Sequence, residues 1–322
     1  MIKINDTHLH ITYKPTTIYS HYTFDYFLKD KSKYVANTVL FLNPIYSKLY
    51  PCKIGHRYTV YDLDDNQNLM FKCDECSNIS YVGPDPYRED NIKLLKDCYG
   101  KPGLYPYIYL TISNNTLPKE FEFFEKNYKG MFYGIKVHPN LCSRKMSEIK
   151  FDSGYPIVVH CGIGIGDDPK DIAKFAKNYS GNVMFAHFAK FDVKALEEIA
   201  KLPNAFIDTS PLYLAKDILN KSTKEYYPSK ITEIEDLTAL IKNLIAIVGE
   251  DKVVFGSDCP WGSQTDCIEL YQKLNLPQTT KNKIFYENFN RFNVVRTLQS
   301  QLESSEQDVE VKNERIENNL NR

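Results

Sequence analysis

Short apolar runs alternate along the chain with longer segments in which apolar residues recur every three to four positions. The short runs predict strands buried on both faces, because such strands lose the alternation of polar and apolar residues. Eight strands are predicted, at residues 2–11, 35–42, 105–112, 132–138, 156–161, 182–187, 205–208 and 252–257. The longer segments predict helices with one buried face. They lie at residues 22–31, 86–99, 117–128, 169–178, 192–201, 233–248 and 265–274.

This regular order of strands and helices predicts an α/β protein with a parallel sheet covered by helices. Eight such units can close into a (β/α)8 TIM-type barrel, and a doubly wound open sheet is the alternative. We favour the barrel because residues that bind metals follow strands in both halves of the chain, and only closure brings the first and eighth strands together. We expect the barrel to span residues 1–296, with an insertion at 45–84 after the second strand and a polar, flexible tail at 297–322.

Composition narrows the class of protein. The chain of 322 residues is 43% hydrophobic and 25% charged, which supports a large core, and its net charge of −1 argues against nucleic acid as a partner. The sequence shows no secretion signal and no apolar run near ~18 residues, so we expect a cytoplasmic protein that does not bind membranes. A homo-oligomer is compatible with this composition. Eight scattered cysteines are expected to be reduced thiols.

The first strand carries two histidines, His8 and His10, separated by one residue. Successive side chains of a strand point to opposite faces, so these two imidazoles point the same way. Two imidazoles aimed at one point form half of a metal site, whereas a pair of surface histidines is the plain alternative.

Further polar residues follow three other strands. His160 ends the fifth strand, His187 ends the sixth, and Asp258 follows the eighth. The carboxyl ends of barrel strands form the catalytic face, so these side chains are expected to meet His8 and His10. Imidazole nitrogen and carboxylate oxygen are ligands of Zn²⁺, and a catalytic site leaves one position for water. His8, His10, His160 and Asp258 can therefore bind one ion that activates water, whereas each histidine taken alone can also be a buried structural residue. Asp258 can also transfer protons, and His187 can polarise a carbonyl or serve as a second acid–base group.

Six ordered motifs carry a resemblance to a known family. They are residues 6–10 (DTHLH), 134–139 (GIKVHP), 158–162 (VVHCG), 185–187 (FAH), 207–210 (IDTS) and 255–260 (FGSDCP). In this order they resemble the amidohydrolase superfamily, in particular the metal-dependent branch that includes aminocarboxymuconate-semialdehyde decarboxylase. Residues 286–292 also resemble the closing helix of that branch.

The resemblance implies a (β/α)8 barrel with one divalent metal on His8, His10, His160 and Asp258, and His187 as catalytic partner. Zn²⁺ is the expected ion, and Mn²⁺ or another divalent metal is the alternative. The expected reaction is hydrolysis of an amide, lactone or related C–N or C–O bond in a small polar substrate. The branch also contains decarboxylases, so non-oxidative decarboxylation of a small carboxylic acid is the rival reaction.

Lys136 and His138 share one face of the fourth strand. In some relatives a carboxylated lysine on this strand bridges two metals, so these two residues are candidates for a second metal. Binding of a substrate anion or a buried ion pair is the other interpretation of Lys136, and His138 can line the pocket instead. We favour a single active-site ion.

The insertion at 45–84 departs from the family pattern. It contains Cys52 and His56, and then Cys73 and Cys76 on a predicted hairpin. A Cys-x2-Cys turn often binds structural zinc, and the other two residues can complete four ligands. Reduced cysteines in a packed flap are the alternative.

Three weaker hypotheses rest on single features. The glycines at 162, 164 and 166 suggest a phosphate-binding loop, but their spacing differs from G-x-G-x-x-G and an active-site loop is preferred. Arg57 and Arg88 are candidates for binding a substrate carboxylate. A binding protein without turnover is also conceivable, although the complete ligand set argues against it.

Overall fold

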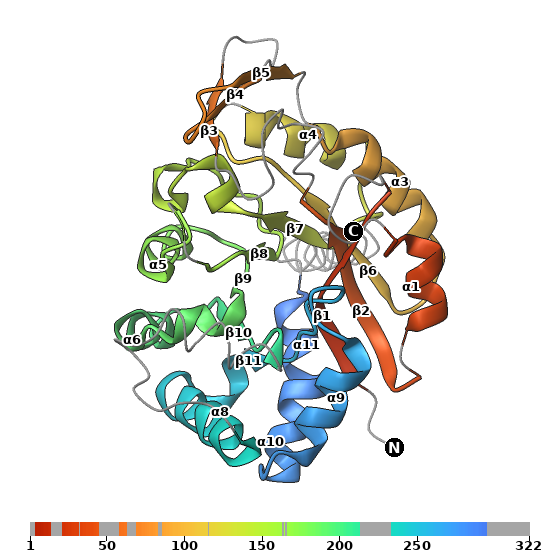
Figure 1. Cartoon of the computed structure of the whole chain (residues 1–322), viewed down its shortest axis with the longest axis vertical. Coiled ribbons are helices and arrows are strands. Elements are labelled where there is room, and N and C mark those ends of the chain that lie inside the picture. Colours follow the sequence, from red (N-terminus) through yellow and green to blue (C-terminus); the bar gives the residue numbers. More distant parts are fainter. Residues whose placement is uncertain are drawn as a thin grey trace, which may run out of the picture.

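A barrel of eight parallel strands forms the centre of the molecule (Figure 1). The computed structural model describes residues 4–13, 21–31, 33–44, 58–62, 69–82, 86–114, 116–162, 164, 166–212 and 233–294. The strands follow one another around the sheet in the order β1 (Ile4–Ile11), β2 (Val35–Leu42), β6 (Leu104–Tyr109), β7 (Gly134–Val137), β8 (Ile157–Val159), β9 (Val183–Phe185), β10 (Ala205–Asp208) and β11 (Val253–Val254). The predicted TIM-type barrel is confirmed, and the eighth strand is shorter than the sequence pattern indicates.

Helices cover the outside of this barrel (Figure 1). They are α1 (Phe24–Asp30), α3 (Arg88–Cys98), α4 (Thr116–Tyr128), α5 (Pro169–Ala176), α6 (Val193–Ala200), α8 (Ile234–Val248) and α9 (Gln264–Lys273). Two short 3₁₀ turns, Pro139–Cys142 and Met146–Glu148, connect β7 to β8. Side-chain caps begin four of the helices, because their oxygens accept from a backbone N–H that the helix leaves unpaired. The capping residues are Thr23, Asp168, Asp192 and Ser263.

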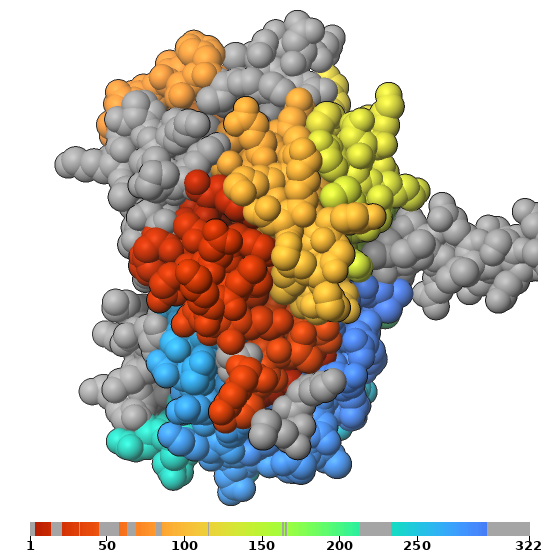
Figure 2. All heavy atoms as spheres, turned by 90° about the vertical axis from the view of Figure 1, so that its right-hand side faces the viewer, coloured from red at the N-terminus to blue at the C-terminus, as the bar shows by residue number. Residues whose placement is uncertain are grey.

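Backbone hydrogen bonds between the first strand and the segment after β11 join the two ends of the sheet. The Asp258 N–H donates to the His8 carbonyl at 2.7 Å, and the His10 N–H donates to the Cys259 carbonyl at 2.7 Å. Figure 2 shows the N-terminal elements in red beside the C-terminal helices in blue. This closure places the Asp258 side chain beside the histidines of β1.

The amino end of the barrel is filled with side chains. Helix α11 (Asn288–Phe292) contributes Phe289 and Phe292 to the apolar cluster inside the barrel. The Asn182 amide, just before β9, donates to the carbonyls of Arg291 and Phe292 at 2.9 Å and fixes this helix. The opposite, carboxyl end is therefore the end where polar side chains can gather.

The insertion forms a three-stranded antiparallel sheet, made of β3 (Tyr58–Asp62), β4 (Leu69–Cys73) and β5 (Ile79–Val82). The sequence predicts the first two strands as a hairpin and misses the third. Asp62 accepts hydrogen bonds from Ser113 at 2.7 Å and Thr116 at 2.8 Å. These bonds attach the sheet to the loop that follows β6, at the carboxyl rim of the barrel.

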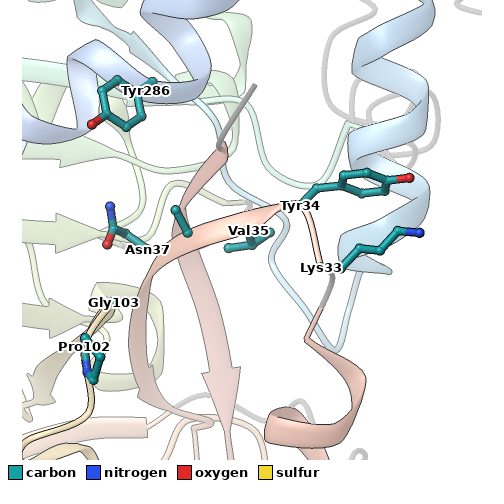
Figure 3. Close-up of a pocket in the computed structure, with 8 residues that line it drawn as sticks. Lys33, Tyr34, Val35, Asn37, Pro102, Gly103 and Tyr286 are labelled. Atoms are coloured by element: carbon teal, nitrogen blue, oxygen red, sulfur yellow. The ribbon is translucent and has the colours of Figure 1, made fainter. Parts of the chain in front are cut away.

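A surface pocket lies at the amino end of β2 (Figure 3). Its lining residues are Lys33, Tyr34, Val35, Ala36, Asn37, Pro102, Gly103 and Tyr286. Val35 pairs with Ile4 and Phe41 with His10, so the pocket and the histidines lie at opposite ends of the barrel. Since active sites of such barrels lie at the carboxyl end, we assign this pocket no catalytic role.

None of the helices in the described part of the chain has the length and apolar character that a membrane crossing requires.

Candidate metal centre

Three potential metal ligands converge at the carboxyl end of the barrel. His8 Nε2 lies 3.3 Å from His10 Nε2, and Asp258 Oδ1 lies 3.2 Å from the first and 3.4 Å from the second. In a tetrahedral site with bonds of about 2.0–2.1 Å, neighbouring ligand atoms are about 3.3–3.4 Å apart. The three side chains therefore have the spacing of three corners of a tetrahedral divalent-metal site.

Hydrogen bonds on the far side of each ring direct the Nε2 atoms inward. His8 Nδ1 lies 2.7 Å from the Asp208 carboxylate, and His10 Nδ1 lies 3.0 Å from the Leu42 carbonyl. Both oxygens accept hydrogen bonds, so each Nδ1 carries a hydrogen, and each ring in its neutral form presents an Nε2 lone pair. A carboxylate or carbonyl behind a histidine is the usual support of a metal ligand.

The charges of the cluster favour a cation at its centre. Burial lowers the pKa of His10 to about 4, so this ring is neutral near pH 7. Burial raises the pKa of Asp258, but the neighbouring imidazoles outweigh it and hold this pKa well below its usual value. Burial also opposes protonation of His8, yet the Asp208 and Asp258 carboxylates prevail and raise its pKa. A proton and a metal ion would thus compete for the same place, as is common for metal sites.

Lys136 adds a buried amine to this centre. Its Nζ lies 3.4 Å from His8 Nε2 and 4.9 Å from the centre of the Phe41 ring. Burial lowers the pKa of Lys136 to about 8, so a positive charge remains at neutral pH. The side chain can therefore attract an anionic substrate group.

Five imidazoles form a closed ring around the carboxyl end of the barrel. Their centres are 5.3 Å apart for His8 and His10, 5.8 Å for His10 and His138, 4.5 Å for His138 and His160, 4.7 Å for His160 and His187, and 5.2 Å for His187 and His8. Burial lowers the pKa values of His138, His160 and His187, so these three rings are neutral. All the histidines that the sequence assigns to the site therefore lie together.

His160, the fourth predicted ligand, does not belong to the compact cluster, and the ring of His187 connects it to Asp258. Its Nδ1 lies 2.9 Å from His187 Nε2, and its Nε2 lies 3.8 Å from Asp167 Oδ2. His187 in turn places Nδ1 2.9 Å from the Ser210 carbonyl and 3.9 Å from Asp258 Oδ2. A direct chain of contacts thus leads from the three-ligand cluster through His187 to His160.

The backbone that carries His187 is unusual. His187 and the four residues after it all have positive φ angles, between 48° and 59°, and none of them is glycine. Left-handed backbone costs about 1–2 kcal/mol per residue in L-amino acids. Such conformations concentrate at functional sites, because the surrounding structure must hold them in place.

Other predicted site residues lie elsewhere. Arg88 forms an ion pair with the buried Glu120 and stacks over Phe123, so it does not reach the cluster. Arg57, Cys52 and His56 lie outside the described residues.

The zinc hypothesis for the insertion therefore stays a prediction. Cys73 and Cys76 lie at the turn between β4 and β5, where the Cys76 N–H donates to Cys73 Sγ at 3.4 Å.

Three further carboxylates support the site and were not predicted from the sequence. They are Asp6, Asp167 and Asp208, all buried. Asp6 accepts from the N–H groups of His8 and Ser257 at 3.1 and 3.0 Å and so connects the two sides of the cluster. Asp208 follows three apolar residues at the end of its strand, which is the same signal that identifies His160 and His187.

Comparisons with known proteins find one matching family model and several solved structures of similar fold. Residues 138–292 match the model of a family described as amidohydrolase. No curated protein sequence matches the chain.

Several solved structures have a similar fold over 91% of this chain. One is 5-carboxyvanillate decarboxylase from Sphingomonas paucimobilis, with a TM-score of 0.56, 9% identity and 99% of its chain covered. A second is an amidohydrolase from Burkholderia multivorans, with a TM-score of 0.55, 11% identity and 99% covered. A third is a dihydroxybenzoic acid decarboxylase from Polaromonas sp. JS666 with bound manganese, with a TM-score of 0.52, 11% identity and 97% covered. At these identities the likeness shows a shared fold.

Proposed function

We propose that this chain, whose residues 138–292 match the amidohydrolase family model, is a metal-dependent hydrolase whose reaction centre is the cluster of His8, His10 and Asp258. The observation that carries the proposal is the spacing of three inward-facing acceptor atoms, 3.2–3.4 Å apart, beside buried carboxylates. Imidazole and carboxylate together suit Zn²⁺ or Mn²⁺. When bound, the ion would supply a Lewis acid that polarises a substrate oxygen or activates water.

The surrounding side chains suit a small anionic substrate. Lys136 supplies a buried positive charge beside the cluster, which would hold a substrate carboxylate. Asp258 Oδ1 belongs to the cluster while its Oδ2 lies 3.9 Å from His187, so this carboxylate can hold a proton between the cluster and the ring. We therefore assign substrate binding to Lys136 and proton transfer to Asp258 and His187. His160 is proposed as the fourth ligand, and His138 as a residue of the pocket wall.

We retain hydrolysis of an amide, lactone or related bond as the first reaction, in agreement with the amidohydrolase family match. Non-oxidative decarboxylation is the second candidate, because two of the similar structures belong to decarboxylases. Both reactions place an electron-rich substrate group beside a positive centre, which the ion and Lys136 would provide.

A product analysis in labelled water separates the two reactions. The protein, loaded with Zn²⁺ or Mn²⁺, is incubated in H₂¹⁸O with a panel of small lactones, amides and hydroxybenzoic acids. Hydrolysis predicts one ¹⁸O atom in the product, and decarboxylation predicts released CO₂ with no label in the remaining acid or phenol. Turnover equal to that of metal-free protein for every member of the panel would contradict a metal-dependent enzyme of this substrate range.

A further inference from the structure

Asp167 is a buried carboxylate beside the site with one unused oxygen. It lies between β8 and α5, and its side chain has no exposed surface. Oδ1 accepts a hydrogen bond from the Asn140 N–H at 3.0 Å. Oδ2 has no hydrogen-bond partner among the described residues and lies 3.8 Å from His160 Nε2. A buried acceptor without a donor costs free energy, and burial raises the pKa of Asp167 to about 8. A donor that reaches Oδ2 would therefore stabilise the charged form of this carboxyl group.

Glycines keep the approach between these two atoms open. A Cβ atom at Gly162 would lie 2.6 Å from His160 Nε2 and 2.8 Å from Asp167 Oδ2. A Cβ atom at Gly164 would lie 3.3 Å from the same oxygen and 2.9 Å from Asn140 Cβ. Close packing against Asp167 therefore explains these two glycines without a phosphate.

The hydrogen bonds of the neighbouring rings define where the hydrogen of His160 lies. The Ser210 carbonyl can only accept, so His187 carries its hydrogen on Nδ1. The neutral His187 ring then accepts at Nε2, and His160 donates to it from Nδ1 at 2.9 Å. His160 Nε2 is left with a lone pair that faces an acceptor oxygen of Asp167. In this arrangement Asp167 Oδ2 accepts no hydrogen from His160, and no other described residue donates to it.

We propose that Asp167 is the positioning residue that accepts the hydrogen of His160 Nε2 when His160 uses Nδ1 as a metal ligand. Ligation requires that Nδ1 lose its hydrogen to solvent, and the neutral ring regains one from solvent at Nε2. Asp167 Oδ2 then gains its missing partner, which is the support that a ligating histidine usually has. His187 Nε2 loses its donor at the same time and becomes free to accept a proton. This inference rests on the proposed metal centre.

Asp167→Asn tests the assignment with nearly the same volume. The single amide oxygen of the new side chain is needed by the Asn140 N–H, so its NH₂ group faces His160 Nε2 and donates to it. That bond holds the hydrogen of His160 on Nδ1 and opposes ligation. Asp168→Asn is the matched control, because Asp168 is exposed, undergoes the same carboxyl-to-amide exchange and caps α5, a role that asparagine also performs.

The first readout is the dissociation constant for Zn²⁺, measured by competition with a chromogenic chelator. We expect Asp167→Asn to weaken binding about 10–100-fold, the usual effect of losing such a support. Asp168→Asn is expected to remain within about twofold of the wild-type value. Equal affinity of Asp167→Asn and wild type would overturn the role of Asp167, whereas a wild type that binds no Zn²⁺ would instead overturn the proposed metal centre.

The second readout is the position of the hydrogen on the His160 ring, and its decisive comparison uses wild-type protein alone. In wild-type protein with ¹⁵N-labelled histidine, NMR should place the hydrogen of His160 on Nδ1 without metal and on Nε2 with Zn²⁺. In Asp167→Asn it should remain on Nδ1. A hydrogen that stays on Nδ1 in Zn²⁺-saturated wild-type protein would contradict the inference, even if the variant fails to fold.

Discussion

Replacing Asp258 with asparagine is expected to lower kcat/KM about 10²–10³-fold, the scale of losing one preorganised group that stabilises the transition state. The neutral amide removes the only negative charge among the three converging ligands, so bound metal should fall as well. The fold should survive, since the Asp258 N–H, which donates to the His8 carbonyl, remains. Asparagine also tolerates the left-handed φ angle of 55° at this position.

Steady-state kinetics and metal analysis on the same preparation measure this effect. Asp266→Asn, an exposed carboxylate in the first turn of α9, is the matched control and should change neither quantity. If Asp258→Asn kept wild-type turnover and metal content, Asp258 would have neither of the roles assigned to it.

Replacing Asp208 with alanine is expected to lower the free energy of unfolding of the metal-free protein by about 3–5 kcal/mol, as for other broken buried ion pairs. Asp208 has no exposed surface and accepts from His8 Nδ1 at 2.7 Å. It also accepts from the His187 N–H at 2.9 Å and from the Ser210 hydroxyl at 2.7 Å. Alanine would leave these buried donors without an acceptor.

Urea denaturation with a chelator present isolates this effect from metal binding. Asp251→Ala is the control, because Asp251 pairs with Lys283 and Arg291 at the exposed surface, where such pairs contribute at most about 1 kcal/mol. A loss below about 1 kcal/mol for Asp208→Ala would show that His8 does not depend on this carboxylate.

The pH dependence of this stability has a defined direction. Burial raises the pKa of Asp208, but His8 and the hydrogen bonds outweigh it and hold this pKa at about 2. A carboxyl group with a depressed pKa in the folded state stabilises fully above its unfolded pKa of about 3.9. The difference between wild type and Asp208→Ala should therefore shrink as the pH falls from about 4 to about 2.

The barrel could be predicted because its strands are short apolar runs that end in polar residues. His160, His187 and Asp258 each follow such a run, and closure of the barrel brings them beside β1. Asp208 also follows a short apolar run. Its role could not be predicted, because its carboxylate accepts a hydrogen bond from His8 Nδ1 on the side of the ring that faces away from the cluster.

Other features left no readable signal in the sequence. Five consecutive left-handed residues begin at His187, yet none is glycine, so no residue type marks the turn. The third strand of the insertion, β5, has only four residues and follows the tight turn at Cys76. The separation of His160 from the compact cluster depends on side-chain hydrogen bonds, which a strand pattern does not specify.

Anomalous diffraction from crystals grown with Zn²⁺, recorded at the zinc edge, tests the metal centre most directly. We predict one peak per chain at the carboxyl end of the barrel, about 2.0–2.2 Å from His8 Nε2, His10 Nε2 and an Asp258 oxygen. Fully bound Zn²⁺ in solution without a peak between these three side chains would contradict the proposed enzyme.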